Sequence, residues 1–489
     1  MASLWSKERF PRDIAPVGSA NAEHSSRATQ IEEPDPEGWR SRFQQDYDRL
    51  LFSTPVRRLS DKTQVWPMDE NDGVRTRLTH SHEVANLARS IGSRVASKTP
   101  GIFGEADLHD VVQPILSAIG LAHDLGNPPF GHQGEMAICG WFKYREKWIF
   151  SKENENGEGL PISIPKPLRE EFTNFDGNPQ SFRLITKLQT NVSQVGLDLT
   201  AATLAASLKY PVSASNCEPK KPACKKVGYF ESEAKLINWM REQTGLCEGQ
   251  RHPLTWIMEA CDDIAYSVLD VDDAMKKGVI SPDDVLAILD TDQNLQSLGI
   301  VHRIKTSFEK VNTQLPRPRA EVARDIKIGY IRAHLIEALI KEASEAFIEG
   351  VQPIMSMTHE IPLMDGSSLC DALKKVAQQY AFANVGVLRM ETIGAAAIDG
   401  LMSFFWKAIS DRSKVDDLSS RRRSASAKYG YALISPNYLE DAIRNANSTG
   451  KEGGIRYREL RLLTDMVSGM TDTFAIKLWR DLKEVPNCL

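Results

Sequence analysis

Apolar residues recur at helical spacing along most of this chain, and strand-like alternation is rare. Val84, Leu87, Ala88 and Ile91 occupy the i, i+3, i+4 and i+7 positions, which share one face of a helix. Long amphipathic segments such as IGYIRAHLIEALIKEASEAF, which begins at Ile328, continue this pattern into the second half of the chain. The pattern therefore predicts an all-α fold.

The length of the chain predicts more than one helical unit. At 489 residues it exceeds the roughly 250–300 residues at which a single hydrophobic core stops growing. Residues 1–38 are polar with scattered proline and predict a flexible or loosely docked N-terminal arm. We expect a main domain over 39–280, with an insertion at about 146–250. A helical region over 281–489 is expected to complete the site and to make oligomer contacts.

Composition excludes several classes of protein. The net charge of −5 does not fit a protein whose main task is to coat nucleic acid. No run approaches the roughly 18 apolar residues that a membrane span needs, and the first residues lack the apolar stretch of a secretory signal. Seven cysteines without metal-finger spacing indicate reduced thiols. We therefore expect a soluble cytoplasmic protein with no membrane association.

Two histidines and an aspartate are expected to point into the helical core. His123 shares a stripe with the apolar residues of its helix, including Leu116 and Ile119. The glycines and prolines that follow Asp124 end this helix and hold both side chains at its end. His80 precedes Val84 by one turn and faces the same buried side. Buried imidazoles need partners, which favours a ligand role.

A third segment, EACDDIAYSVLDVDDA from Glu259, supplies a further carboxylate. Asp262 falls on the apolar face of this predicted helix, whereas Asp263 is rotated by about 100°. Imidazoles combined with carboxylates bind divalent metal ions, so the pattern indicates metal-assisted hydrolysis. For any one of these residues alone, a hydrogen-bonded core histidine or a capping aspartate is the simpler interpretation.

Five segments together resemble one known family. RTRLTHSHEV, GLAHDLGNPPFGHQGE, FDGNPQSFR, DDIAYSVLDVDDA and DMVSGMTDTFA are similar to the deoxyguanosinetriphosphate triphosphohydrolase (dGTPase) family of the HD-domain metal-dependent phosphohydrolases. The likeness runs from about Arg57 to the C-terminus. It implies an HD-domain helical core with inserted and C-terminal helical segments. His82 departs from the family, which more often has an apolar residue there, and this puts no ligand in doubt.

The resemblance also implies a metal centre. One divalent ion per subunit would be held by the same four residues, His80, His123, Asp124 and Asp262. Manganese or magnesium is the expected ion, and iron, cobalt or zinc also suits such a ligand set.

The implied reaction splits a deoxynucleoside triphosphate, with dGTP favoured, into deoxynucleoside and tripolyphosphate. The departing 5′ oxygen is a poor leaving group, and a general acid would contribute about 10²–10⁴ in rate. The resemblance places a catalytic histidine at His132 and its acidic partner at Glu135. Whether His132 acts as acid, base or nucleophile stays open, and a pair that helps to cap a helix is the simpler alternative.

The resemblance also implies a set of substrate contacts. Asp270 would accept a hydrogen bond from the 3′-hydroxyl, and Tyr266 would pack where a 2′-hydroxyl would otherwise lie. Contacts to phosphate, sugar or nucleoside are implied for Gln64, Arg77, Asn178, Lys209, Tyr210 and Lys226. The alternatives are solvated surface lysines and a helix with an acidic outer stripe that continues to Asp272 and Asp273.

Partners are implied in the same way. The resemblance implies a homo-oligomer, with a hexamer favoured. Arg421, Arg422 and Arg423 with Lys428 form the densest basic cluster in the chain. This cluster could reach the site of a neighbouring subunit or bind single-stranded DNA, which some relatives use as an activator. A solvated loop is the alternative.

Two other functions remain open from the sequence. One is a different HD-domain phosphohydrolase that acts on nucleoside monophosphates or cyclic nucleotides, which the segments GNPPFGHQGE and DDIAYS disfavour. The other is a nucleic-acid-binding regulator with a nucleotide-sensing pocket. The complete ligand set and the His132/Glu135 pair argue against a loss of catalysis.

Overall fold

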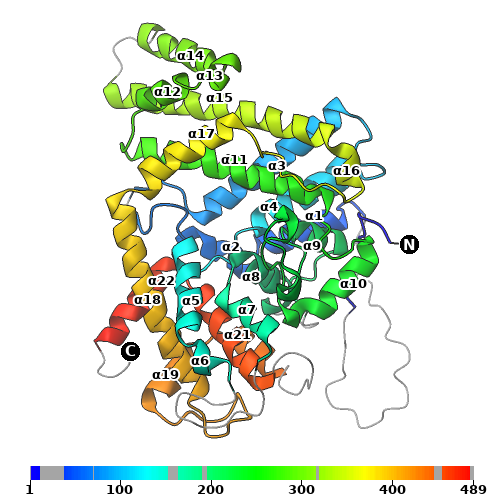
Figure 1. Ribbon diagram of the computed structural model, residues 1–489, viewed down its shortest axis with the longest axis vertical. Helices are drawn as coiled ribbons and strands as arrows, with labels where there is room; N and C mark the ends of the chain where they lie inside the picture. Colours follow the sequence, from blue (N-terminus) through cyan, green and yellow to red (C-terminus); the bar gives the residue numbers. More distant parts are fainter. Residues whose placement is uncertain are drawn as a thin grey trace.

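The regular structure of the protein is helical (Figure 1). The computed structural model describes residues 2–11, 38–69, 71–151, 164–189, 195–314, 319–444 and 454–484. Within these ranges it contains no strand, only isolated bridges between single residues. The predicted all-α fold is confirmed.

Three helices form the centre of the fold. They are α3 (Arg77–Lys98), α4 (Gln113–Ala122) and α11 (Pro253–Lys276), and they pack against one another. A proline at the start of α11 fits a position where no backbone N–H is needed. The helix then runs without a further glycine or proline and is buried along most of its length. It crosses the upper half of the molecule in Figure 1.

Two apolar clusters surround these helices. The first joins α3 and α11 to α14 (Ile300–Gln314), α15 (Ala320–Glu349) and α17 (Ser368–Ala377). The second joins α5 (Gly131–Tyr144), α18 (Val385–Ser410), α21 (Gly454–Ser468) and α22 (Asp472–Lys483). Both clusters include residues from before and after position 280. The predicted domain boundaries stay a prediction.

Helix α4 belongs to both clusters. Leu116 and Ile119 lie in the first cluster, whereas Ala118 and Leu121 lie in the second. The end of α4, which carries His123, therefore lies where the two clusters meet.

The remaining α-helices complete the body. They are α1 (Arg42–Leu51), α2 (Thr54–Arg58), α6 (Glu146–Ile149), α7 (Lys166–Thr173), α8 (Gly177–Arg183), α9 (Ala201–Ser207), α10 (Ala234–Thr244), α12 (Pro282–Asp290), α13 (Gln293–Ser297), α16 (Val351–Met355), α19 (Ala425–Leu433) and α20 (Pro436–Arg444). Figure 1 shows α12, α13 and α14 at one end of the molecule and α19 at the other.

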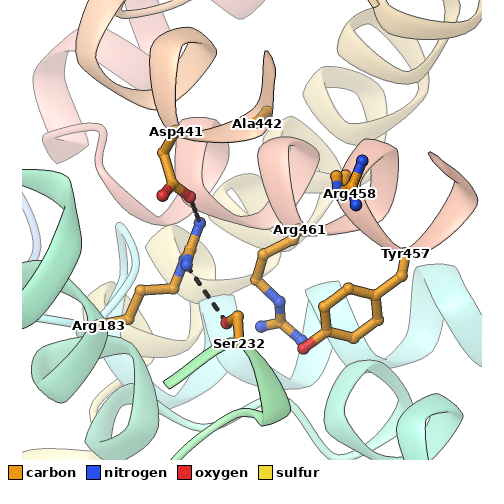
Figure 2. A pocket seen from close by; sticks show the side chains of 7 residues that line it. All are labelled: Arg183, Ser232, Asp441, Ala442, Tyr457, Arg458 and Arg461. Atoms are coloured by element: carbon orange, nitrogen blue, oxygen red, sulfur yellow. Dashed lines mark hydrogen bonds and ion pairs between the residues drawn. The ribbon is translucent and has the colours of Figure 1, made fainter. Parts of the chain in front are cut away.

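A buried arginine anchors α8, which contains most of the FDGNPQSFR segment. The guanidinium of Arg183 lies 2.7 Å from both Asp441 and Asp465 and 2.9 Å from Glu233. Figure 2 shows Arg183 between Asp441 and Ser232. Three carboxylates around one buried guanidinium offset the cost of removing it from water. These contacts tie α8 to α20 and α21.

The basic loop before α19 is partly buried. The side chain of Arg422 points into the protein, its guanidinium lies 3.5 Å from the centre of the Tyr431 ring, and its Nε donates to the Ala408 carbonyl at 2.8 Å. Arg421, Arg423 and Lys428 are exposed. Arg422 therefore takes no part in an exposed basic cluster.

The first residues of the chain pack on the body. The backbone N–H of Ala201 donates to the carbonyl of Glu8 at 2.8 Å, and Arg9 pairs with Asp46 of α1 at 3.0 Å. The Trp5 ring packs edge-on against His252 at a centroid distance of 5.1 Å. Residues 2–11 of the predicted flexible arm are thus packed. Residues 12–37 of that prediction lie outside the described residues.

His252, which precedes α11, makes the stability of this contact depend on pH. Its Nε2 lies 3.1 Å from the Leu4 carbonyl and its Nδ1 accepts the Leu254 N–H at 3.2 Å, so only the neutral ring satisfies both. Burial lowers the pKa of His252 to about 4. Between pH 6.5 and 4 the unfolded chain binds a proton that the folded chain does not, and stability falls as the pH falls.

We expect a loss of about 3 kcal/mol from this group by pH 4. Thermal unfolding between pH 7 and pH 4 measures it, with His252→Asn as the comparison. The variant should lose less stability than the wild type over this range, and equal losses would contradict the assignment.

Two expectations from composition concern cysteines and membranes. The cysteines of the described ranges are free thiols, as the sequence predicts. No single helix in these ranges combines the length and apolar character of a membrane span, although the bent pair Ser368–Phe382 and Val385–Ser410 meets both criteria together.

Candidate metal centre

The turn after α4 holds His123 and Asp124 against α8. The Gly126 N–H donates to the Ser181 hydroxyl at 2.8 Å, and this hydroxyl donates to the His123 carbonyl at 3.0 Å. A Cβ at Gly126 would lie 2.1 Å from the Ser181 nitrogen, so only glycine fits here. Two segments that carry the family resemblance are thus joined at the site.

Three of the four predicted ligands converge on one point. The Nε2 atoms of His80 and His123 lie 3.5 Å and 3.6 Å from Oδ1 of Asp262. One ligand atom from each of the three residues lies within 4.8 Å of the others. His80 comes from the first turn of α3 and its side chain is 1% exposed, whereas Asp262 comes from the middle of α11 and is 29% exposed. The group is therefore buried but reachable from one side.

The two histidines fit a metal ion. His123 Nδ1 lies 2.7 Å from the Gly120 carbonyl, so Nε2 is the ring nitrogen available to a metal ion. In the described part of the chain, Nε2 of His80 and Nε2 of His123 are buried and have no hydrogen-bond partner. Buried polar atoms without partners are costly. A divalent cation would satisfy both nitrogens and the Asp262 carboxylate.

Asp124 lies beside this group. Its Oδ2 is 3.5 Å from His123 Nε2 and also pairs with Arg77, while its Oδ1 accepts the Asn127 amide at 2.6 Å. Burial alone would raise the pKa of Asp124, but Arg77 and His123 lower it to about 2. The carboxylate is therefore ionised. Both of its oxygens already have protein partners.

Lys209 contacts a predicted ligand. Its ammonium lies 3.0 Å from Oδ2 of Asp262, the oxygen that faces away from the imidazoles. Burial would raise the pKa of Asp262, but Lys209 and the two histidines hold it well below its usual range. The neighbouring Asp263 pairs with Lys374 at 2.9 Å. Asp262, not Asp263, therefore belongs to the convergent group, as the helical facing predicts.

His132 and Glu135 form a hydrogen-bonded pair at the start of α5. His132 Nδ1 lies 3.0 Å from one Glu135 oxygen, and the other oxygen accepts the Gly177 N–H at 2.7 Å. The hydrogen bond to Glu135 raises the pKa of His132. The His132 side chain is 76% exposed. The pair borders an open pocket of about 670 Å³ that Asp176 and Lys226 also line.

Close contacts connect this pair to Asp124. A Cβ at Gly177 would lie 2.0 Å from Oδ1 of Asn127 and 3.1 Å from Oε1 of Glu135. Asn127 in turn donates to Asp124. Gly177 therefore lies between Glu135 of the predicted catalytic pair and Asn127, the hydrogen-bond partner of the predicted ligand Asp124.

The predicted sugar contacts lie along α11. Asp270 is buried, and neither of its carboxylate oxygens has a hydrogen-bond partner among the described residues. Burial, aided by Asp273, raises its pKa well above the usual value. Tyr266 is partly exposed and stacks on Phe382 at 5.4 Å. A buried carboxyl group without a partner is free to bind a hydroxyl.

The acidic residues after Asp270 do not form an outer stripe. Asp272 and Asp273 are buried and both pair with the guanidinium of Arg75, which lies in the first family segment. Arg332 of α15 also bonds to Asp272 at 3.0 Å. The surface-stripe alternative is therefore wrong.

Four further residues were predicted to contact the substrate. Asn178 and Lys226 both donate to Asp176, each at 2.6 Å. Tyr210 is buried, and the buried Oε1 of Gln64 has no hydrogen-bond partner within the described ranges. Asp176 was missed by the sequence interpretation although it lies in the quoted FDGNPQSFR segment.

Fold and site together define an all-α protein with a candidate divalent-metal centre beside a histidine and glutamate pair. Comparison with known proteins gives the family. The chain is 35% identical to a deoxyguanosinetriphosphate triphosphohydrolase-like protein of Listeria innocua and 34% identical to that of Listeria monocytogenes. It is 30% identical to the deoxyguanosinetriphosphate triphosphohydrolase of Klebsiella pneumoniae. Each alignment covers 91% of this chain and 94% of the relative.

The chain therefore belongs to the deoxyguanosinetriphosphate triphosphohydrolase family, which confirms the resemblance of its motifs. It is a member of an enzyme family. No protein-family model matches it.

Proposed function

We propose that this protein hydrolyses a deoxynucleoside triphosphate, with dGTP favoured, to deoxynucleoside and tripolyphosphate at a metal-dependent HD-domain site. The observation that carries the proposal is the pair of buried Nε2 atoms of His80 and His123, which have no hydrogen-bond partner among the described residues and face one oxygen of Asp262 at 3.5 and 3.6 Å. Family membership supports the choice of substrate.

One divalent ion per subunit, manganese or magnesium by preference, would be held by His80, His123, Asp124 and Asp262. When bound, it would polarise a phosphate oxygen and lower the pKa of the attacking water. The reaction then breaks the bond between the α-phosphorus and the 5′ oxygen. His132 would donate a proton to this oxygen, because the hydrogen bond to Glu135 favours the protonated form of its ring.

The chain's own cations would bind the tripolyphosphate. It carries about four negative charges, which charge-assisted hydrogen bonds from Arg77, Lys209 and Lys226 would balance. Each of these side chains pairs with a carboxylate in the structure. Binding therefore requires each to share or exchange its partner. Asp270 would accept the 3′-hydroxyl, and Tyr266 would exclude a 2′-hydroxyl.

Other parts of the proposal rest on the family resemblance. These are a hexameric assembly, a cytoplasmic location and single-stranded DNA as an effector. The exposed Arg421, Arg423 and Lys428 are compatible with an effector site.

The phosphate product tests the reaction. Purified protein is incubated with each dNTP and with GTP, in Mn²⁺ or Mg²⁺ and in ¹⁸O-labelled water, and the products are separated by ion chromatography. We expect tripolyphosphate and deoxynucleoside in equal amounts, with the label in tripolyphosphate because water attacks the α-phosphorus. The Asp262→Asn variant, purified in the same way, reports contaminating phosphatases.

Other products would replace the proposal. Pyrophosphate or orthophosphate as the sole product would indicate a different nucleotide phosphohydrolase. Binding of single-stranded DNA without hydrolysis of any dNTP would indicate a regulator.

A further inference from the structure

A buried lysine outside the predicted site contacts the turn between α4 and α5. The Lys62 side chain is 3% exposed, and its ammonium donates to the carbonyls of Asn127 at 2.5 Å and Ser468 at 2.8 Å. Its backbone carbonyl accepts the N–H of Arg77, the first residue of α3, at 3.0 Å. Lys62 thus joins the start of α3, the turn and the end of α21.

A buried aspartate makes the matching contacts from the other side. Asp472 is the first residue of α22. One of its oxygens accepts the Phe130 N–H at 3.0 Å, and the other accepts both the N–H and the hydroxyl of Thr63. Each of the two side chains therefore bonds to the turn, Lys62 at Asn127 and Asp472 at Phe130. Each also bonds to the segment of the other, Lys62 at Ser468 and Asp472 at Thr63.

The turn has a backbone that needs such support. Phe130 has φ +62° and Gly131 has φ +54°, two consecutive residues in the left-handed region. This region is unfavourable for a phenylalanine. A Cβ at Gly394 of α18 would lie 2.5 Å from the Phe130 ring, so this glycine makes room for it. Because α5 begins at Gly131, these dihedral angles set the direction in which His132 leaves the turn.

We propose that Lys62 and Asp472 are positioning residues that hold the Phe130–Gly131 turn and so align His132 with the metal group. Among the described residues, neither side chain forms a hydrogen bond with a predicted ligand; their partners are Asn127, Ser468, Thr63 and Phe130. Their influence passes through Asn127, which bonds to Asp124, and through Phe130, which lies two residues before His132. The catalytic part of this inference rests on the proposed function.

A graded set of substitutions tests the proposal. Asp472→Ala removes the oxygens that accept from Phe130 and from Thr63, whereas Asp472→Asn keeps one of these two oxygens. Thr63→Val removes only the hydrogen bond from the Thr63 hydroxyl. We expect kcat per metal-loaded site to fall by about 10–100-fold in Asp472→Ala, because small misplacements of a catalytic group have effects of this size. The fall should be smaller in Asp472→Asn and smallest in Thr63→Val, with KM and metal content within about threefold of wild type.

A nearby contact supplies the matched control. The Thr473 hydroxyl donates to Asp61 at 2.7 Å and joins the same two segments at the surface. Thr473→Ala should keep the kcat of the wild type. A purely structural role for Asp472 would lower the amount of folded protein and leave kcat per metal-loaded site unchanged, which would overturn the proposal.

Hydrogen exchange provides a readout that does not depend on activity. Amide exchange in peptides that cover residues 124–135 should accelerate at least about tenfold in Asp472→Asn, while peptides from the middle of α3 stay unchanged. Unchanged exchange in the turn would refute the positioning role even if the enzyme proved to catalyse another reaction. If exchange in the turn is faster but the wild-type enzyme forms a product other than tripolyphosphate, the positioning role stands and only the proposed function is refuted.

Discussion

Asp262→Asn is expected to abolish both metal binding and dNTP hydrolysis. Oδ1 of Asp262 is the oxygen that both buried imidazoles face, and an amide supplies no negative charge there. The Lys209 ammonium, which pairs with this carboxylate, would further disfavour a cation beside the neutral amide. Mutation of a residue that hydrogen-bonds to a metal ligand lowers metal affinity by about 10–100-fold. For a direct ligand we therefore expect a loss of at least about 100-fold in Mn²⁺ affinity.

The measurement is Mn²⁺ affinity by isothermal titration, together with the metal content of the purified protein. Asp263→Asn is the matched control, because Asp263 is the next residue of α11 and pairs with Lys374 instead. It should retain metal and activity. Wild-type Mn²⁺ affinity in Asp262→Asn would refute the ligand assignment.

The second large effect is expected at His132. His132→Gln should keep its metal and lose about 10²–10⁴ in kcat, the contribution of a general acid. The side chain lies outside the convergent metal group and is largely exposed, so the variant should fold normally. His82→Gln replaces another exposed histidine on α3 and should have no effect. Loss of metal in His132→Gln would contradict this division of roles.

The partner of His132 gives this prediction a pH signature. Glu135 raises the pKa of His132, so Glu135→Gln should lower it. If the protonated ring is the active form, activity falls as the pH rises through this pKa. The alkaline limb of the pH profile should therefore move to lower pH in Glu135→Gln. A limb that moves to higher pH would exclude His132 as the acid.

The spacing of apolar residues along the sequence was enough to predict the helices. It also predicted on which face of a helix several site residues lie. Helical spacing placed His123 with buried leucines and isoleucines, and it separated Asp262 from Asp263. Each of these predictions needs only the geometry of one helix, because residues one turn apart share a face.

Contacts between distant segments could not be predicted in this way. Asp272 resembles a surface acid in the sequence, but the packing of α3 and α15 on α11 buries it against Arg75 and Arg332. Arg422 likewise looks like part of a solvated cluster, although Tyr431 and backbone carbonyls enclose it. Lys62 and Asp472 carry no local signal, because their partners lie on other segments.

The double membership of α4 has a thermodynamic consequence. One helix supplies side chains to both apolar clusters and carries His123 at its end, so an ion that requires this histidine binds only when both clusters are folded. By linkage, such an ion stabilises both clusters at once. Chelation should then lower the melting temperature of both clusters together in one transition.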